Sequence, residues 1–509
     1  MPVPPRPYSP TVIRERVPHP GDGAEASLAV ARPAAPPLGR RVAANTAVQV
    51  GGLVVGTLLS FGFLRLATWY LGVDRFGDLA IVMTLGALVV TLADLGVATT
   101  LARELARHAE RSQETAARLL AFRIASSALI TLLVLAAIPF SPYAGVVKQA
   151  LALSLVGVFF TSVGTFSKAF FQVNLTLQRQ AALDLTQKTL NLAALGVAIW
   201  IGVGLLPVVA LLAAANVVVA AASFRLVRPY WRPGVRFSAS KETRTLVRSA
   251  VAIGLVSMIG LLHYRGDAVL LSLLKPARDV GIYSIAYRFI DQAFVLPGFF
   301  MAAVFPTLTR YAHSADRERR DRLVNRAFQV LLVGAVLVAL AVYTLAPLLV
   351  RVVAGPAFHD AVEPSRILAP ALVFLFVSPV FYNLLIAMDR QSSLVWLGIV
   401  ALALNVALTL ALIPRFSYNG AAAATVASEG FTCCCTFLLC RRLAGARVDW
   451  SPVGRVLAAA GAAVAAAVLL RGASVVAFVA GEAIFLGGVF ALRAFRWDEV
   501  RLVLGRRPG

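Results

Sequence analysis

Residues 42–71 read VAANTAVQVGGLVVGTLLSFGFLRLATWYL, a run of thirty residues in which Arg65 is the one charged side chain. A helix that crosses the hydrocarbon core of a bilayer needs roughly 20 mostly apolar residues, so this stretch is predicted to span a membrane. Similar runs recur from about residue 41 to residue 493. Over the whole chain of 509 residues, 59% are hydrophobic and 14% are charged, against about 25% charged residues in soluble domains. The sequence therefore predicts an all-α integral membrane protein.

The apolar runs divide into fourteen predicted spans, separated by short polar connections. They lie near 42–71, 78–100, 117–139, 150–172, 183–204, 207–227, 246–274, 280–308, 323–350, 366–388, 393–413, 418–440, 452–470 and 473–492. If the last two runs, which are Ala-rich and closely spaced, do not cross the membrane, the number is twelve.

Composition changes mark five regions. The first forty residues contain ten prolines and little clustered apolar surface, which predicts a disordered cytoplasmic tail rather than a secretory signal. A long basic loop then divides the spans into two sets of six. The predicted regions are the tail 1–40, an N-lobe 41–228, a basic cytoplasmic linker 229–245, a C-lobe 246–442, and two further helices with a basic cytoplasmic tail at 443–509.

A weak internal repeat supports this division. In both residues 71–80 and residues 275–286 a short turn precedes a glycine that opens the next helix, and these glycines, Gly77 and Gly281, lie about 204 residues apart. Because the first and seventh spans then run in the same direction, the repeat predicts two pseudo-symmetric six-helix lobes around a central cavity.

The net charge of +23 is explained by its distribution. Basic clusters occupy alternate connections and both ends of the membrane region, at 40–41, 103–111, 225–244, 310–322, 441–447 and 493–507. Loops that carry many Lys and Arg stay in the cytoplasm, so both termini are predicted to be cytoplasmic, with an even number of spans. This asymmetry accounts for the charge without nucleic acid as a partner.

The residues needed for several kinds of chemistry are missing. A Walker A loop ends in Gly-Lys-Ser/Thr, and none of the five lysines follows a glycine. The five histidines form no HExxH motif. The four cysteines all lie in the twelfth span, and three of them are consecutive, so they point in different directions and cannot converge on one metal ion. We therefore expect no enzymatic activity, no cofactor and no metal site.

Three arginines lie inside predicted spans. An ionised side chain at the bilayer centre costs at least about 2.5–3.5 kcal/mol, so each needs an explanation. With a rise of about 1.5 Å per residue, Arg65, Arg288 and Arg265 lie about 8, 12 and 13 Å below the outer end of their helices. Their shared depth predicts a positively charged cavity, because the guanidinium fork suits a phosphate or diphosphate. The alternative is local neutralisation, of Arg288 by Asp291 and of Arg265 by Asp267.

Acidic residues at membrane depth are candidates for coupling to protons or sodium, or for balancing arginines and capping broken helices. They are Asp94, Asp267, Asp291, Glu429 and Glu482. His263 and Asp267 share a helix face at i,i+4 and form a possible titrating pair; the alternative for His263 is a packed, uncoupled histidine.

The other charges inside the spans have simpler explanations. Arg123 and Lys168 lie within about two turns of the predicted cytoplasmic helix ends, from which long side chains can reach the interface. Asp184 and Lys188 are spaced i,i+4 and can neutralise one another.

The chain resembles the polysaccharide transporter (Wzx-type) branch of the multidrug/oligosaccharidyl-lipid/polysaccharide (MOP) exporter superfamily. The matching segments, over about residues 45–445, are YLGVDRFG at 70–77, DLG at 94–96, Arg103, DAVLL at 267–271, VGIYSIAYR at 280–288, PTLTR at 306–310, Asn405, Ile413-Pro414 and NGAAAAT at 419–425. The resemblance implies a flippase with a central cavity. Its substrate would be a lipid-linked oligosaccharide, carried on undecaprenyl diphosphate in the bacterial plasma membrane.

The resemblance further implies alternating access and contact with membrane lipid and with glycan polymerase or synthesis enzymes. The thirteenth and fourteenth spans exceed the twelve-helix core, as in lipid II flippases. Two alternatives remain. A drug/cation antiporter of the same superfamily predicts an acidic cavity without clustered arginines. A non-transporting scaffold for glycan enzymes predicts that deletion of residues 1–38 abolishes function.

Overall fold

The computed structural model describes residues 38–108, 112–238, 240–313, 316–470 and 474–492. The predicted N-terminal tail, as far as residue 37, and the predicted basic tail from residue 493 lie outside the described residues. The chain divides into two units, Met1–Ala44 and Asn45–Gly509, and the architecture below is that of the second unit. Inner and outer ends are named after the predicted orientation, with the termini inside.

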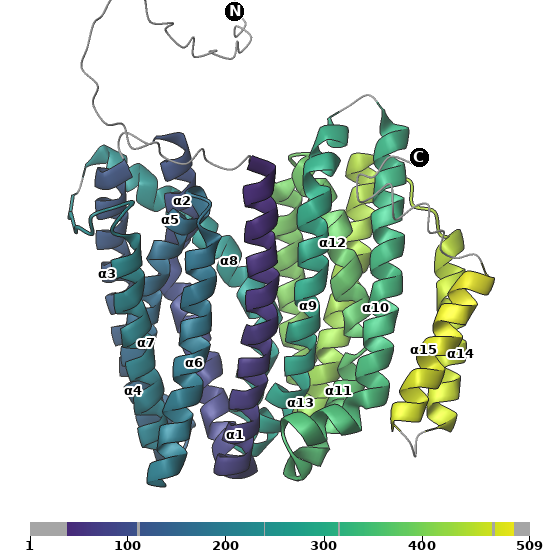
Figure 1. The fold of residues 1–509 in the computed structure, drawn as a ribbon, viewed down its shortest axis with the longest axis horizontal. Coiled ribbons are helices and arrows are strands. Elements are labelled where there is room, and N and C mark those ends of the chain that lie inside the picture. Colours follow the sequence, from purple (N-terminus) through teal and green to yellow (C-terminus); the bar gives the residue numbers. More distant parts are fainter. Residues whose placement is uncertain (1–37, 109–111, 239, 314–315, 471–473, 493–509) are drawn as a thin grey trace, which may run out of the picture. The chain divides into compact units, whose positions relative to one another are not determined.

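The described residues form helices and no strand (Figure 1). The first half of the chain contains α1 (Leu38–Asp94), α2 (Val97–Arg107), α3 (Ser112–Ala137), α4 (Gly145–Gly164), α5 (Lys168–Val173), α6 (Leu177–Ile201) and α7 (Leu205–Val227). The second half contains α8 (Lys241–Leu274), α9 (Ala277–Ala312), α10 (Arg317–Val353), α11 (Val362–Leu368), α12 (Ala371–Ala387) and α13 (Gln391–Leu439), followed by α14 (Ser451–Leu469) and α15 (Ser474–Ala491).

All fourteen predicted spans coincide with helical segments. Within the described residues, nine helices are long and apolar enough to cross a membrane, and the bent pair of residues 356–368 and α12 makes a tenth. Two of these helices are hairpins: α1 turns back at Gly72 (φ 69°) and α13 at Ser417 (φ 49°), so each supplies two predicted spans. The remaining two spans are α6 and the Ala-rich α14. The predicted all-α membrane fold is confirmed.

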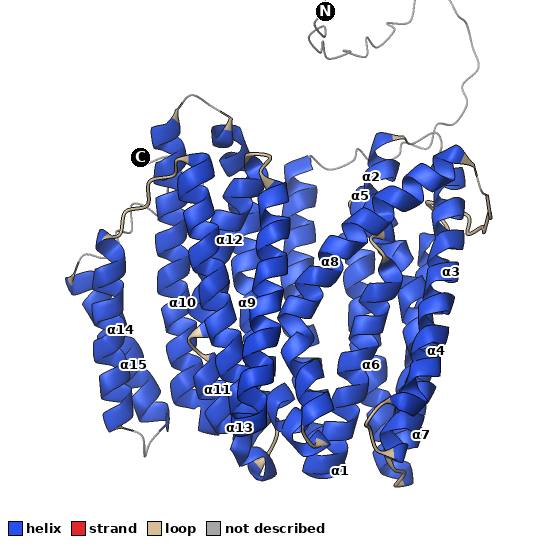
Figure 2. Cartoon of the chain, turned by 180° about the vertical axis from the view of Figure 1, so that it is seen from behind, coloured by secondary structure: helices blue, strands red, loops and turns tan. Residues whose placement is uncertain are grey.

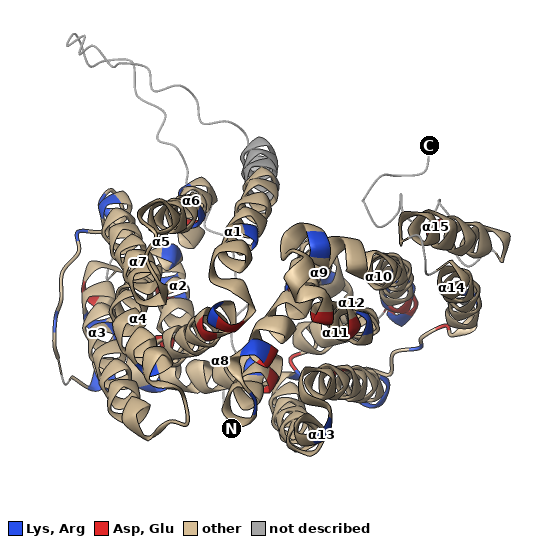
Figure 3. Cartoon of the chain, turned by 90° about the horizontal axis from the view of Figure 1, so that it is seen from below, with Lys and Arg blue, Asp and Glu red and all other residues tan. Residues whose placement is uncertain are grey.

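The helices form two groups, seen along their axes in Figure 3. In the N-lobe (α1–α7), α4 packs closely against α7 because their contact consists of small residues: a Cβ added to Gly157 would lie 2.7 Å from Ala213 Cα. Small residues let membrane helices approach in this way. In the C-lobe (α8–α13), α12 packs against α9, α10 and α13. The pair α14 and α15 packs on α10.

Helix α8 belongs to both lobes. Its inner half contacts α2 and α3, and the rest packs along α13, so that it slants across the molecule in Figure 2. The preceding segment, part of the predicted linker, is held on the N-lobe: Trp231 is 1% exposed and stacks on Phe170 with ring centres 5.2 Å apart. The start of α8 is fixed by Ser240, whose side chain accepts a hydrogen bond from the backbone N–H of Thr243, a standard N-cap.

Glycines mediate the contacts between the lobes. At the outer end, Gly77 and Gly281, the glycines of the sequence repeat, touch: a Cβ on Gly281 would lie 3.1 Å from Gly77 Cα. At the inner end, Gly96 packs on Gly254 of α8, and a Cβ on Gly96 would lie 2.6 Å from the Gly254 nitrogen. The lobes therefore meet at both ends through surfaces with no room for a side chain.

Candidate functional site

The first buried charge pair lies in the N-lobe and joins Asp94 to Arg123. The prediction that Arg123 reaches the membrane interface is wrong, because its side chain is 1% exposed. Its Nη2 donates to the Ser162 carbonyl at 2.6 Å and to Thr165 Oγ1 at 2.8 Å. The physical reason is that α4 ends at Gly164, which leaves a last-turn carbonyl in need of a donor.

In the C-lobe, Asp291 is the partner of Arg265. Arg265 Nη2 lies 2.7 Å from Asp291 Oδ2, and Tyr264 donates to Oδ1 at 2.8 Å. Arg265 is thus neutralised by an acid, as the alternative predicts, but by Asp291 instead of Asp267. Asp291 forms no ion pair with Arg288, although its charge acts on that arginine. Asp267 is 1% exposed and accepts hydrogen bonds from Tyr283 and from Thr425, the latter at 2.7 Å.

Two other predicted pairings are replaced by contacts between helices. Asp184 of α6 pairs with Lys168 of α5, Nζ to Oδ1 3.1 Å, instead of with Lys188. His263 Nε2 lies 3.3 Å from Glu429 Oε1 of α13, instead of pairing with Asp267. In both cases a residue from a neighbouring helix is closer than the one a turn away, which spacing along the sequence does not reveal.

Of the six cations singled out in the sequence, Arg123, Lys168 and Arg265 are paired in this way, whereas Arg65, Lys188 and Arg288 form no ion pair among the described residues. The i,i+4 spacing of Asp184 and Lys188 hides this role of Lys188 in the sequence, because it predicts that the two residues neutralise one another. Lys188 Nζ lies over α1, 2.7 Å from where a Cβ of Gly56 would be. Arg288 has a buried Nε without a hydrogen-bond acceptor. Lys188 is repelled by the charge of Arg288 and attracted by Asp184, and Arg288 is repelled by Arg265 and attracted by Asp291. Lys188, Arg265 and Arg288 therefore belong to one electrostatic group.

This group lies where the lobes meet. Lys188 comes from α6 of the N-lobe and Arg288 from α9 of the C-lobe, and a 3.0 Å hydrogen bond between Thr57 and Gln292 joins α1 to α9 nearby. A cavity of about 330 Å³ adjoins Lys188 and is lined from both lobes, including Gln172 and Phe299. A second cavity of about 350 Å³ shares Gln172 and contains the Asp94 and Arg123 pair.

Arg65 occupies a different place from the other two predicted arginines. It is exposed, and its Nη1 lies so close to Gly355 that a Cβ there would clash with it. Next to it, Phe76 of the N-lobe packs edge-on against Phe358 of the C-lobe, with ring centres 5.5 Å apart. The structure thus brings Arg265 and Arg288 together and places Arg65 at the outer contact between the lobes.

The arrangement suits an anion that is held between the lobes. Unneutralised cations at membrane depth are costly, and an anionic ligand lowers that cost. The described residues contain no group of three or more His, Cys, Asp or Glu placed to hold a metal ion.

Comparisons with known proteins give a family and a fold. The family model described as "Polysaccharide biosynthesis protein" matches residues 42–312, more than half of the chain. No curated protein matches the sequence. Among solved structures, the lipid II flippase MurJ in an inward closed conformation has a TM-score of 0.72 at 10% identity, covering 89% of this chain and 99% of that one.

Two further structures have a similar fold at similarly low identity. An inward-facing multidrug resistance MATE family transporter has a TM-score of 0.63 at 15% identity, covering 79% of this chain and 98% of that one. A MOP superfamily transporter from Pyrococcus furiosus has a TM-score of 0.58 at 16% identity, covering 80% and 96%. The fold is therefore that of MOP superfamily transporters.

Proposed function

The chain belongs to the polysaccharide biosynthesis protein family, and from this premise we propose that it is a flippase for a lipid-linked oligosaccharide. The substrate would carry an undecaprenyl-diphosphate-type anchor and would move from the inner to the outer leaflet of the bacterial plasma membrane. The fold supports a transporter with two lobes, and the family supports a glycan as the transported group.

The observation that carries the proposal is the pair of Lys188 and Arg288 on opposite lobes, neither of which forms an ion pair among the described residues. A diphosphate has two charged groups and can bridge both side chains. Arg288 offers a planar fork that binds two oxygens, whereas Lys188 acts as a point charge. Arg265 is held by Asp291 and adds to the positive potential. Arg65, at the outer contact, would meet the diphosphate as it leaves.

In the proposed cycle, the inner contact at Gly96 and Gly254 opens first and admits the headgroup, while the lipid chain stays in the bilayer. Binding of the diphosphate draws the lobes together, after which the outer contact at Gly77 and Gly281 opens. With the cell interior negative, each negative charge that crosses the full potential outward gains about 2.3 kcal/mol per 100 mV, so ATP is not required.

The buried acids of the C-lobe are proposed coupling residues. Asp267 is enclosed by Tyr283 and Thr425, and Glu429 lies beside His263; either carboxyl could take up a proton or a sodium ion. Asp94 and Asp291 are neutralised by arginines, which suits a positioning role better. A cation antiporter, the alternative function, would have to use Asp267 and Glu429, because Asp94 and Asp291 are already paired with arginines.

The test is glycan export in cells that carry Lys188→Ala or Arg288→Ala at normal protein level. We expect each variant to lower export at least tenfold and to accumulate the lipid-linked intermediate on the inner leaflet, because each removes one of two diphosphate contacts. Lys148→Ala is the matched control, since Lys148 is at the outer surface and donates to the Pro139 carbonyl. Export within twofold of normal in the double variant, Lys188→Ala with Arg288→Ala, would contradict the proposal.

A further inference from the structure

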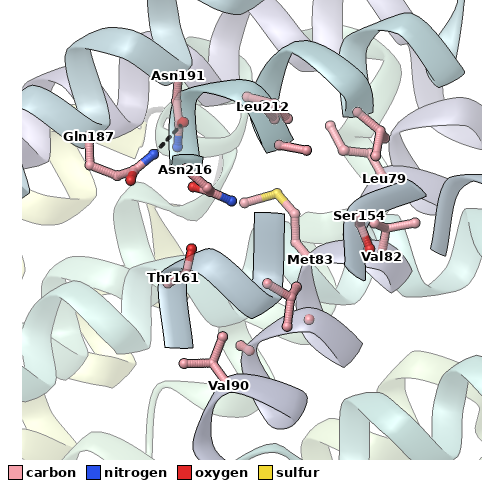
Figure 4. Close-up of a pocket in the computed structure, with 15 residues that line it drawn as sticks. Leu79, Val82, Met83, Val90, Ser154, Thr161, Gln187, Asn191, Leu212 and Asn216 are labelled. Carbon is pink, nitrogen blue, oxygen red and sulfur yellow. Dashed lines mark hydrogen bonds between the residues drawn. The ribbon is translucent and has the colours of Figure 1, made fainter. Parts of the chain in front are cut away.

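A separate cavity of about 270 Å³ lies in the N-lobe, lined by α1, α4, α6 and α7 and partly open to its surroundings (Figure 4). Three carboxamides, Gln187, Asn191 and Asn216, gather on one side of it, with Leu79 and Met83 across from them. Two hydroxyl groups, from Ser154 and Thr161, also line the cavity. Carboxamides in an otherwise apolar lobe at membrane depth require hydrogen-bond partners.

The protein provides hydrogen-bond partners for only some of the polar groups that line this cavity. Gln187 Nε2 donates to Asn191 Oδ1 at 2.8 Å, and Ser154 is bonded to the Leu151 carbonyl. Asn216 has no hydrogen-bond partner among the described residues, although it reaches the cavity next to Gly157. Gln187 and Asn191 also keep unused donors and acceptors, since a carboxamide can make about four hydrogen bonds.

The cavity is uncharged, in contrast to the site between the lobes. None of its lining residues is Asp, Glu, Lys or Arg, so it has no charge with which to neutralise a diphosphate or an organic cation. It nevertheless communicates with the charged site. Thr161, Gln187 and Asn216 also line a smaller cavity of about 120 Å³, which reaches Asp184 at the wall of the Lys188 cavity.

Given the proposed function, we propose that this cavity binds a sugar residue of the glycan headgroup while Lys188 and Arg288 hold the diphosphate. A sugar hydroxyl both donates and accepts hydrogen bonds, as does a carboxamide, and the C–H faces of the ring pack on the apolar side at Leu79 and Met83. Ligand pockets usually measure about 300–1,000 Å³, so a cavity of about 270 Å³, just below that range, takes one sugar rather than the whole oligosaccharide. The carboxamides then set sugar specificity.

The experiment uses the glycan without its lipid diphosphate. The probe is the oligosaccharide released by mild acid from the lipid-linked intermediate of cells depleted of the protein. Binding of this probe and of inorganic diphosphate is measured on the purified full-length protein in nanodiscs, with Asn216→Leu and Gln187→Met as variants. Both replacements keep the approximate size of the side chain and remove its hydrogen-bonding groups.

We expect the Kd of the oligosaccharide to rise at least fivefold in each variant, while the Kd of diphosphate changes less than twofold. Lys188→Ala should show the reverse pattern. Thr186→Val is the matched control, because this α6 hydroxyl lies outside the cavity and bonds to the Ala182 carbonyl. The melting temperature of Asn216→Leu should not fall, since an unpaired amide is removed; a purely structural role for Asn216 would lower it.

Unchanged oligosaccharide binding in both variants, or no binding by the normal protein at millimolar probe, would overturn the sugar site and leave the flippase proposal standing. Absence of any lipid-linked intermediate after depletion would instead contradict the flippase proposal, and the sugar site with it.

Discussion

At the scale of single residues, the partner of each membrane charge determines its role. Arg123 and Arg265 are both arginines in predicted spans, and each has an acid from another helix, Asp94 and Asp291. Arg288 has none. A neutralised arginine fixes helices in place, whereas an unneutralised one is available to a ligand. The distinction depends on contacts between different helices: Arg123 and Asp94 lie 29 residues apart in the sequence, and Arg265 and Asp291 lie 26 residues apart.

The Asp94 and Arg123 pair is predicted to stabilise the N-lobe. Asp94→Ala leaves a buried guanidinium without a countercharge, which typically costs about 3–5 kcal/mol in a buried pair; the cost here should fall at the lower end, because the Asp94 side chain is 26% exposed. A lower melting temperature of the purified protein would check this. The double variant Asp94→Asn with Arg123→Met should recover most of the loss, and an unchanged melting temperature in Asp94→Ala would refute the assignment.

At the scale of elements, glycines decide how closely helices cross. The contact of α8 with the Leu95–Gly96 turn has backbone against backbone on both sides. Leu95 (φ 42°) and Gly96 (φ 71°) both have left-handed backbone conformations, which for leucine costs about 1–2 kcal/mol. The turn ends α1, starts α2 and presents a flat surface to α8.

Gly254→Leu is predicted to separate α8 from the N-lobe, because any side chain at this position collides with the backbone of Leu95. Forcing extra atoms into a packed contact costs about 1–3 kcal/mol. We expect a lower melting temperature and faster thiol labelling of a cysteine introduced at Ala250, which is buried in this contact. Gly196→Leu on α6 is the control, since a Cβ there meets nothing within 4 Å; equal effects of both substitutions would contradict the role of the crossing.

At the scale of the molecule, the two lobes are joined at both ends. Outer contacts include Gly77 with Gly281, Phe76 with Phe358, and a 2.8 Å hydrogen bond between Tyr143 and Ser272. None of these contacts contains an ion pair among the described residues. They can therefore break, as the proposed cycle requires, without the loss of a salt bridge. Salt bridges of the outer surface, such as Arg278 with Asp360, lie within one lobe.

Holding the outer contact closed is predicted to stop export. In a protein whose four native cysteines are replaced by serine or alanine, Tyr143→Cys and Ser272→Cys would be joined by a reducible bifunctional thiol reagent about as long as a tyrosine side chain. Export should fall more than tenfold and return on reduction. The matched pair Arg278→Cys and Asp360→Cys lies on the same side within the C-lobe and should cross-link without loss. Full export with the first pair joined would show that the lobes need not separate there.

The sequence by itself determined the helical membrane fold and the position of all fourteen helical segments. These follow from composition over about 20 residues and from turn-forming glycines such as Gly72, which are local properties. It also singled out Arg265 and Arg288. Only the tertiary structure decided the partners of the charges, the burial of Arg123, the importance of Lys188 and the carboxamide cavity at Asn216. Electrostatic pairing and cavities depend on which faces of distant helices meet, and this is set by packing over the whole chain rather than by spacing along it.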